Sequence, residues 1–99
     1  MEAATDVTNH DADVPERRQQ IVRRIIDYFG TQEALASQPE LMIDQSAVSL
    51  WLKRGRIPAD RQDQILAASV RMHREGKKDR AIEPWEFFQL PDERSETMH

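Results

Sequence analysis

With 99 residues and no cysteine, the chain is expected to form one small domain without disulfides, thiolate metal sites or a cysteine nucleophile. No apolar run approaches the ~20 residues of a membrane span, and the acidic start is unlike a signal peptide, so we expect a cytoplasmic protein without a membrane partner. The net charge of −4 hides an uneven distribution. Residues 17–80 carry 13 Lys/Arg and 8 Asp/Glu, a balance of +5, whereas the flanks carry 1 and 10, a balance of −9. A cationic middle keeps an anionic partner open, although acidic flanks that only maintain solubility explain the same pattern.

The N-terminal part is predicted to hold a disordered tail and a first helix. Residues 1–13 show no apolar periodicity, as is typical of a disordered segment. Asp13 and Glu16 then have the spacing of a helix-capping box. Apolar residues follow at helical period, at Ile21, Val22, Ile25, Ile26 and Phe29. Gly30 stands where helices often end, so we expect a helix over about residues 14–29.

Two further helices are predicted from their end signals. Thr31 is a favourable N-cap for a short helix with the sequence QEALASQ, which Pro39 cannot continue. Asp44 is a favourable N-cap for a helix over QSAVSLWLKR, and Gly55 stops it. The intervening PELMI is partly apolar and is expected to pack against the domain, either as a connection or as one helical turn.

Pro58 marks the start of a fourth helix, which is expected to run to about Glu75 with Gly76 after it. Its inner side is predicted to carry Ile65, Leu66, Ser69, Met72 and His73. The domain is expected to cover residues 14–90, followed by a disordered tail over 91–99. Three or four short helices and a short aromatic C-terminal segment indicate an all-α fold.

The helix at QSAVSLWLKR divides into two faces when successive residues advance by about 100°. Its apolar side chains fall on one arc, and Gln45, Ser46, Ser49 and Lys53 fall on the other. A polar arc without acidic residues suits a DNA groove, because glutamine pairs with adenine and serine permits a close approach to base edges. Leu50 borders this arc, where it meets a thymine methyl or simply packs.

Residues on both sides of this face are candidates for phosphate contacts. Lys53, Arg54 and Arg56 follow the polar arc and carry the positive charge that neutralises phosphates. Thr31 and Gln32 open the preceding short helix, where a hydroxyl, an amide and a helix N-terminus can hold a phosphate. Two short helices joined closely, with the second polar on one side, are the helix-turn-helix arrangement.

The segments TQEALA and IDQSAVSLWLKRGRIP resemble the helix-turn-helix of phage Cro and repressor-type regulators, especially the small prophage Cro-like proteins, over about residues 20–75. In that family, a Gln supporting a phosphate contact opens the second helix. The recognition helix begins with Gln-Ser, followed by an inward Ala-Val pair and an aromatic residue one turn later. The matching residues here are Gln32, Gln45, Ser46, Ala47, Val48 and Trp51.

The resemblance implies a lambda-repressor-like domain of four to five helices that binds double-stranded operator DNA and regulates transcription, as a repressor. It also implies a homodimer, since such regulators commonly dimerise. One departure concerns the turn, because SQPELMI lacks the usual glycine and is about two residues longer. The angle between the second and third helices is therefore expected to differ, or the second helix to end early.

The segment AIEPWEFFQL leaves two interpretations open. Pro84 disfavours a central strand and favours a single helical turn or an edge segment. Trp85, Phe87 and Phe88 either close the core or form a dimer contact. The alternative function is therefore an antitoxin or a protein-interaction module that uses this segment, with DNA binding secondary.

No other pattern in the chain indicates chemistry. His10, His73 and His99 are too far apart for a metal motif, and no phosphate loop, catalytic triad or cofactor fingerprint is present. We therefore predict that the chain is not an enzyme and needs no cofactor or metal.

Overall fold

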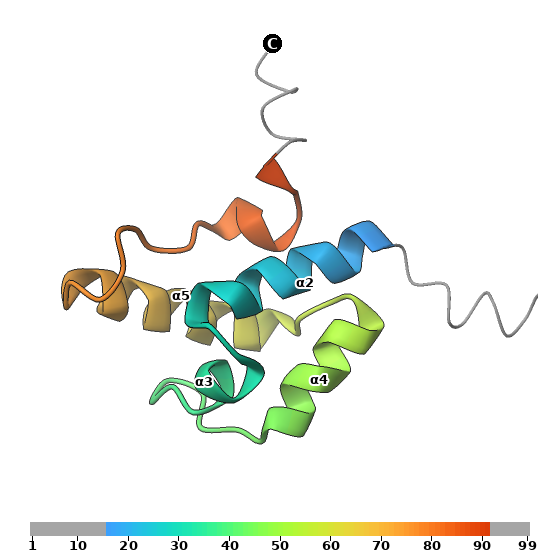
Figure 1. Ribbon diagram of the computed structural model, residues 1–99, viewed down its shortest axis with the longest axis horizontal. Coiled ribbons are helices and arrows are strands. Elements are labelled where there is room, and N and C mark those ends of the chain that lie inside the picture. Colours follow the sequence, from blue (N-terminus) through green and yellow to red (C-terminus); the bar gives the residue numbers. More distant parts are fainter. Residues whose placement is uncertain (1–15, 92–99) are drawn as a thin grey trace, which may run out of the picture.

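The computed structural model describes residues 16–91 as a set of short helices (Figure 1). In chain order they are α2 (Glu16–Phe29), α3 (Gln32–Ala36), α4 (Gln45–Arg54), α5 (Ala59–Arg74) and the 3-10 helix η1 (Pro84–Phe87). No strand occurs within this range, so the predicted all-α class is confirmed. None of these helices combines the length and apolarity needed to cross a bilayer. The Asp13–Glu16 capping box and, apart from Pro91, the two predicted tails lie outside the described residues.

The start of α3 and the end of α4 follow from their capping residues. The Thr31 hydroxyl accepts a hydrogen bond from the Ala34 amide at 3.0 Å, as predicted for an N-cap. α3 ends at Ala36, two residues earlier than QEALASQ predicted, because the chain turns away before Pro39. α4 has its predicted bounds, and Gly55 closes it with a left-handed φ of +72°.

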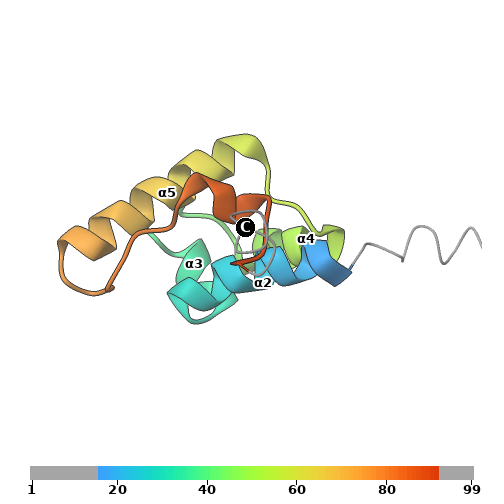
Figure 2. The ribbon, with the colours of Figure 1, turned by 90° about the horizontal axis from the view of Figure 1, so that it is seen from above.

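The helices lie on two sides of α2. Figure 1 shows α3 and α4 on one side of α2 and η1 on the other, with α5 running behind it. Helix α2 packs against α3, α4 and η1, and α3 packs against α4. Figure 2 shows that the chain after α5 returns across α2 and α5. This arrangement leaves one side of α4 facing away from the rest of the molecule.

The core draws apolar side chains from every helix. Its fully buried members include Val22, Ile25, Leu35, Val48 and Ile65. Burying one such side chain contributes about 1.5–3 kcal/mol, which is more than the intrinsic helix preference of a five-residue segment such as α3. Packing, rather than local preference, therefore holds α3 in place.

One core prediction is wrong. Of the residues predicted on the inner side of α5, Ile65 and Ser69 are buried and Leu66 and Met72 are half-buried, but His73 is exposed. The last turn of α5 extends beyond the end of α2 in both views (Figures 1 and 2), so no core surrounds His73. Its Nδ1 lies 3.0 Å from the Lys78 carbonyl oxygen.

A buried serine attaches the returning C-terminal segment to α5. Ser69 is 0% exposed, and its hydroxyl donates to the Leu66 carbonyl at 2.8 Å. The same oxygen accepts a hydrogen bond from the Ile82 amide at 3.0 Å. Ser69 therefore satisfies a buried backbone donor that no helix provides for.

We expect Ser69→Ala to lower the free energy of unfolding by about 1–3 kcal/mol, because the buried Ile82 amide loses its acceptor. Urea denaturation followed by tryptophan fluorescence measures the change. Ser46→Ala is the matched control, since Ser46 is exposed, and should stay within about 0.5 kcal/mol of the wild type. Equal stability of the two variants would show that this hydrogen bond does not hold the segment.

The aromatic segment forms a helical turn beginning at Pro84, as one of the two alternatives predicted. Phe87 is buried and Trp85 is half-buried, with its indole nitrogen donating to Glu83 at 3.0 Å. Phe88 is 59% exposed. The core interpretation is therefore correct for Phe87, and Phe88 remains the exposed aromatic residue of the three.

A buried carboxylate stabilises this turn. Glu86 is 5% exposed and accepts hydrogen bonds from both terminal nitrogens of Arg80, at 2.5 and 3.0 Å, and from the Glu83 amide at 3.0 Å. A nitrogen of Arg24 lies 3.7 Å away. Burial alone would raise the pKa of Glu86, but these hydrogen bonds and cations outweigh it and hold the pKa below its ordinary value.

Candidate nucleic-acid interface

Helix α4 has one buried and one exposed face. Val48 and Trp51 are buried, Leu52 is half-buried against the core, and Ala47 is half-buried. Gln45, Ser46, Ser49 and Leu50 are exposed. The predicted division into a packing face and a free face is therefore confirmed. Residues 45–54 contain no acidic side chain, so the free face carries amide and hydroxyl groups.

A side-chain hydrogen bond joins this face to α3. The Ser49 hydroxyl donates to Oε1 of Gln32, the first residue of α3. Because Oε1 is the acceptor, the Gln32 amide nitrogen is left with hydrogens to donate. Ser49 has used its only hydrogen, so toward any further partner it offers lone pairs. Gln32, a predicted phosphate contact, and Ser49, a predicted base contact, are thus hydrogen-bonded to each other. This bond determines which donor or acceptor groups each side chain has left.

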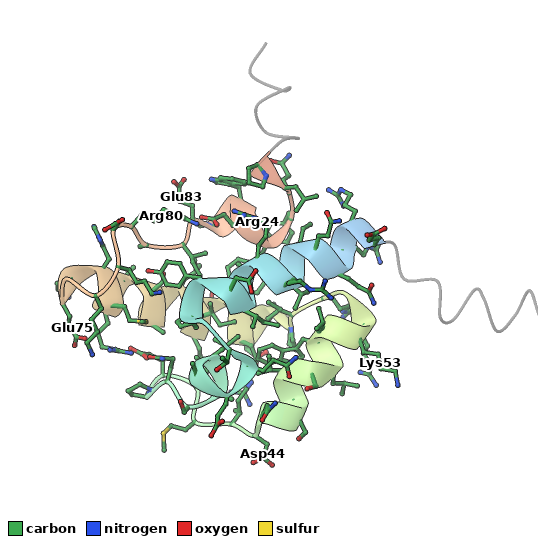
Figure 3. The ribbon with its side chains drawn as sticks, viewed as in Figure 1. Arg24, Asp44, Lys53, Glu75, Arg80 and Glu83 are labelled. Atoms are coloured by element: carbon green, nitrogen blue, oxygen red, sulfur yellow. The ribbon has the colours of Figure 1, made fainter. Side chains whose placement is uncertain are left out.

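The basic residues after this face are exposed, and in the described part of the chain they form no ion pair. Lys53, Arg54 and Arg56 have no carboxylate partner among residues 16–91. Figure 3 shows Lys53 and Asp44 at opposite ends of α4, with the Lys53 side chain pointing away from the helix. Cations in the last turn also stabilise a helix by about 0.3–1 kcal/mol, which gives Lys53 and Arg54 a structural role as well.

Several cations elsewhere are neutralised. Arg71 pairs with Glu40 at 2.7 Å and with Glu75 at 3.1 Å, and Lys77 pairs with Glu75 at 3.3 Å. Arg80 pairs with the buried Glu86. Among the described residues, Arg71 and Lys77 near the end of α5 are thus paired with carboxylates, whereas Arg74 and Lys78, like the three cations at the end of α4, are not.

The connection between α3 and α4 is fixed despite its length and its lack of glycine. Met42 takes the left-handed φ of +53°, a conformation in which glycine is usual, and its side chain is 75% exposed. Its amide donates to the Gln38 carbonyl at 2.9 Å. Arg71 holds the same connection, donating to the Gln38 side chain at 2.6 Å and to Glu40 at 2.7 Å. The hydrogen bond from Arg71 lowers the pKa of Glu40.

Arg71 is a positioning residue that sequence reasoning missed. From sequence, Arg71 is simply one of several basic residues near the end of the fourth helix. The i,i+4 spacing fits the pair with Glu75, but no local pattern links Arg71 to Gln38 and Glu40 more than 30 residues earlier.

Other predicted features sit close to this face but contribute less. Thr31 is exposed, and its oxygen already caps α3. Asp44 stands at the N-cap of α4 without a side-chain capping bond, so its exposed carboxylate brings a negative charge to the start of the helix. Within residues 16–91, no three His, Asp or Glu side chains converge as a metal site would require.

Comparisons with protein-family models, with curated proteins and with solved structures find no match to this chain. Its functional interpretation therefore rests on its own residues and their geometry.

Proposed function

We propose that the chain is a sequence-specific double-stranded DNA-binding protein of the helix-turn-helix type, acting as a Cro-like transcriptional repressor. In this proposal α3 and α4 are the two helices of the motif, and α4 enters the major groove. The observation that carries the proposal is the exposed, acid-free face of α4, followed by Lys53, Arg54 and Arg56, which have no carboxylate partner within residues 16–91. DNA requires both features, since base edges present hydrogen-bonding groups and phosphates require positive charge.

The base-reading roles follow from the groups that each side chain has left. Gln45 is exposed in the first turn of α4 and offers a donor and an acceptor, which together match adenine. Ser49 donates to Gln32 and therefore acts toward a base as an acceptor, which selects the amino group of cytosine or adenine. Ser46 remains free to do either, and Leu50, 42% exposed, suits a thymine methyl group.

The phosphate contacts fall on both sides of this face. Lys53, Arg54 and Arg56 supply charge after α4. Gln32, which precedes α4 in the chain, donates to a phosphate through its amide nitrogen, because its oxygen already accepts a hydrogen bond from Ser49. Thr31 adds only a hydroxyl hydrogen, since its oxygen accepts from the Ala34 amide. Such contacts orient the protein, whereas Gln45, Ser46 and Ser49 choose the sequence.

Gln45→Ala tests the base-reading role. We expect the affinity for a preferred duplex, isolated by selection from random sequences, to fall about 5–150-fold, which corresponds to ~1–3 kcal/mol. Binding to a scrambled duplex should hardly change, because Gln45 contacts no phosphate in this proposal. Fluorescence anisotropy with both duplexes at one salt concentration measures the ratio.

Gln20→Ala is the matched control, since Gln20 is an exposed glutamine on α2. It should leave both affinities unchanged. If Gln45→Ala weakened the preferred and scrambled duplexes by the same factor, Gln45 would not read bases. If the wild type preferred no sequence at all, specific regulation would be excluded.

The exposed side chain of Phe88 supports a second interaction in addition to DNA binding. The Phe88 side chain is 59% exposed to solvent, whereas Phe87 belongs to the core. A second copy meeting this residue would give a homodimer with two α4 helices, as two operator half-sites require. The alternative, an antitoxin or other protein-interaction module, would use the same residue for a different protein.

A further inference from the structure

A pocket lies between α2, the connection from α4 to α5, and the end of η1. Its volume is about 430 Å³, near the lower end of the ~300–1,000 Å³ typical of small-molecule sites. Its apolar wall contains Ile21, Val22, Ile57 and Phe87. These side chains are buried in the core, so the wall is held firmly by the fold.

The polar part of the pocket is basic. Arg17, Arg18 and Arg56 line it, and within the described residues no carboxylate does. The Arg17 guanidinium donates to the Phe88 carbonyl at 2.9 Å, which ties the start of α2 to the end of η1. Arg18 and Arg56 are exposed and have no ion-pair or hydrogen-bond partner for their guanidinium groups in residues 16–91.

We propose that this pocket binds a small amphipathic anion, a molecule with one apolar ring or chain and one anionic head group. The apolar part would contact Ile21, Phe87 and Phe88, covering the exposed aromatic ring. The head group would accept hydrogen bonds from Arg18 and Arg56, because a guanidinium offers paired donors that match a carboxylate or sulfonate. The charge of the lining selects an anion, and the pocket volume restricts the ligand to a small molecule.

Such a ligand would also affect DNA, a consequence that rests on the proposed function. Arg56 lines the pocket and is one of the proposed phosphate contacts. A head group held by Arg56 removes that contact, which lowers DNA affinity by about tenfold at ~0.1 M salt. The pocket would therefore make the DNA-binding face responsive to a small molecule.

The test uses the full chain and two fluorescent probes. 1-Anilinonaphthalene-8-sulfonate carries an apolar ring system and an anion, whereas N-phenyl-1-naphthylamine has similar rings without the charge. We expect the sulfonate to saturate one site and to bind at least tenfold more tightly than the neutral probe. Arg18→Gln and Arg56→Gln should each weaken binding of the sulfonate about 10–150-fold, the range of one charge-assisted hydrogen bond, and leave binding of the neutral probe unchanged.

Arg23→Gln is the matched control, because Arg23 is an exposed arginine on the same helix outside the pocket. It should bind the sulfonate as the wild type does. Absence of saturable binding, equal binding of the two probes, or equal effects of Arg23→Gln and Arg18→Gln would each overturn the proposal. Probe affinity that falls as protein concentration rises would show that a second copy occupies the pocket, and would overturn it as well.

A competition experiment separates this inference from the proposed function. If the sulfonate binds and weakens DNA binding about tenfold, both proposals are supported. If the sulfonate binds but the protein binds no DNA, the proposed function fails and the pocket assignment stands. If DNA binds tightly and the sulfonate does not, the pocket assignment fails alone.

Discussion

Replacing Lys53, Arg54 and Arg56 together by glutamine is expected to lower the affinity for any duplex DNA about 10²–10³-fold at ~0.1 M salt. Each phosphate contact contributes about 0.9 to the slope of log affinity against log salt, so the slope should shrink by about 2.7. The loss should be the same for preferred and scrambled duplexes, because in the proposed complex these side chains contact phosphates. Fluorescence anisotropy between 50 and 200 mM salt gives both quantities.

The control removes the same charge at the other end of the molecule. Arg74, Lys77 and Lys78 follow one another around the end of α5, near Glu75, which Figure 3 shows far from Lys53. Their replacement by glutamine should change the slope of log affinity against log salt by less than about 0.9, the contribution of one phosphate contact. Equal losses in the two triple variants would mean that total charge, rather than the end of α4, governs DNA binding.

Arg80→Met is expected to lower the free energy of unfolding by about 2–3 kcal/mol at pH 7, because it leaves the buried Glu86 carboxylate without its main partner. This is below the ~3–5 kcal/mol typical of a wholly buried pair, since the Arg80 side chain is 51% exposed and Arg24 still faces Glu86. Urea denaturation of the variant and the wild type measures the difference.

The cost of Arg80→Met should depend on pH. In the wild type the pKa of Glu86 is lowered, so the stabilisation by this pair is present above about pH 4.3 and is lost as the pH falls through the folded-state pKa. In the variant, burial raises the pKa and the carboxyl group is protonated more readily. The difference in unfolding free energy should therefore shrink as the pH falls below about 4.3.

A Glu86→Gln background supplies the control for this pair. There Arg80→Met should cost little at any pH, because no buried charge is left unpaired. Glu40, whose pKa is also lowered, contributes equally to both proteins and cancels in the difference. A cost of Arg80→Met that is the same at pH 7 and pH 3.5 would show that Glu86 is not its source.

The helices whose ends carry punctuating residues were the most predictable part of the fold. α4 has its predicted bounds: Gly55 closes it in a left-handed conformation, although Asp44 makes no side-chain capping bond at its start. Its buried face follows from the spacing of Val48 and Trp51. α3 ends two residues before the end of QEALASQ, the early end that the long turn left open, because local signals did not fix where the chain leaves the helix. The prediction that His73 lies on the inner side of α5 was wrong, since periodicity does not reveal where a helix extends past the core.

The candidate site was predictable in its face but not in its contacts. The exposed face of α4 was predictable because it follows from the helical periodicity of residues 45–54 alone. The Ser49–Gln32 hydrogen bond joins residues 17 apart, and Arg71 reaches Glu40 across 31. The different burial of Phe87 and Phe88 was also undetermined, because four large apolar residues around Pro84 show no period that separates an inner from an outer side.

The hydrogen bonds from Arg71 to the connection before α4 have a thermodynamic consequence. Gln38 and Glu40 are already fixed to α5, and Met42 keeps its left-handed backbone. A complex formed through α4 therefore does not have to fold this connection. The heat-capacity change on binding would then report only the surface that the two partners cover, without the large contribution that coupled folding adds.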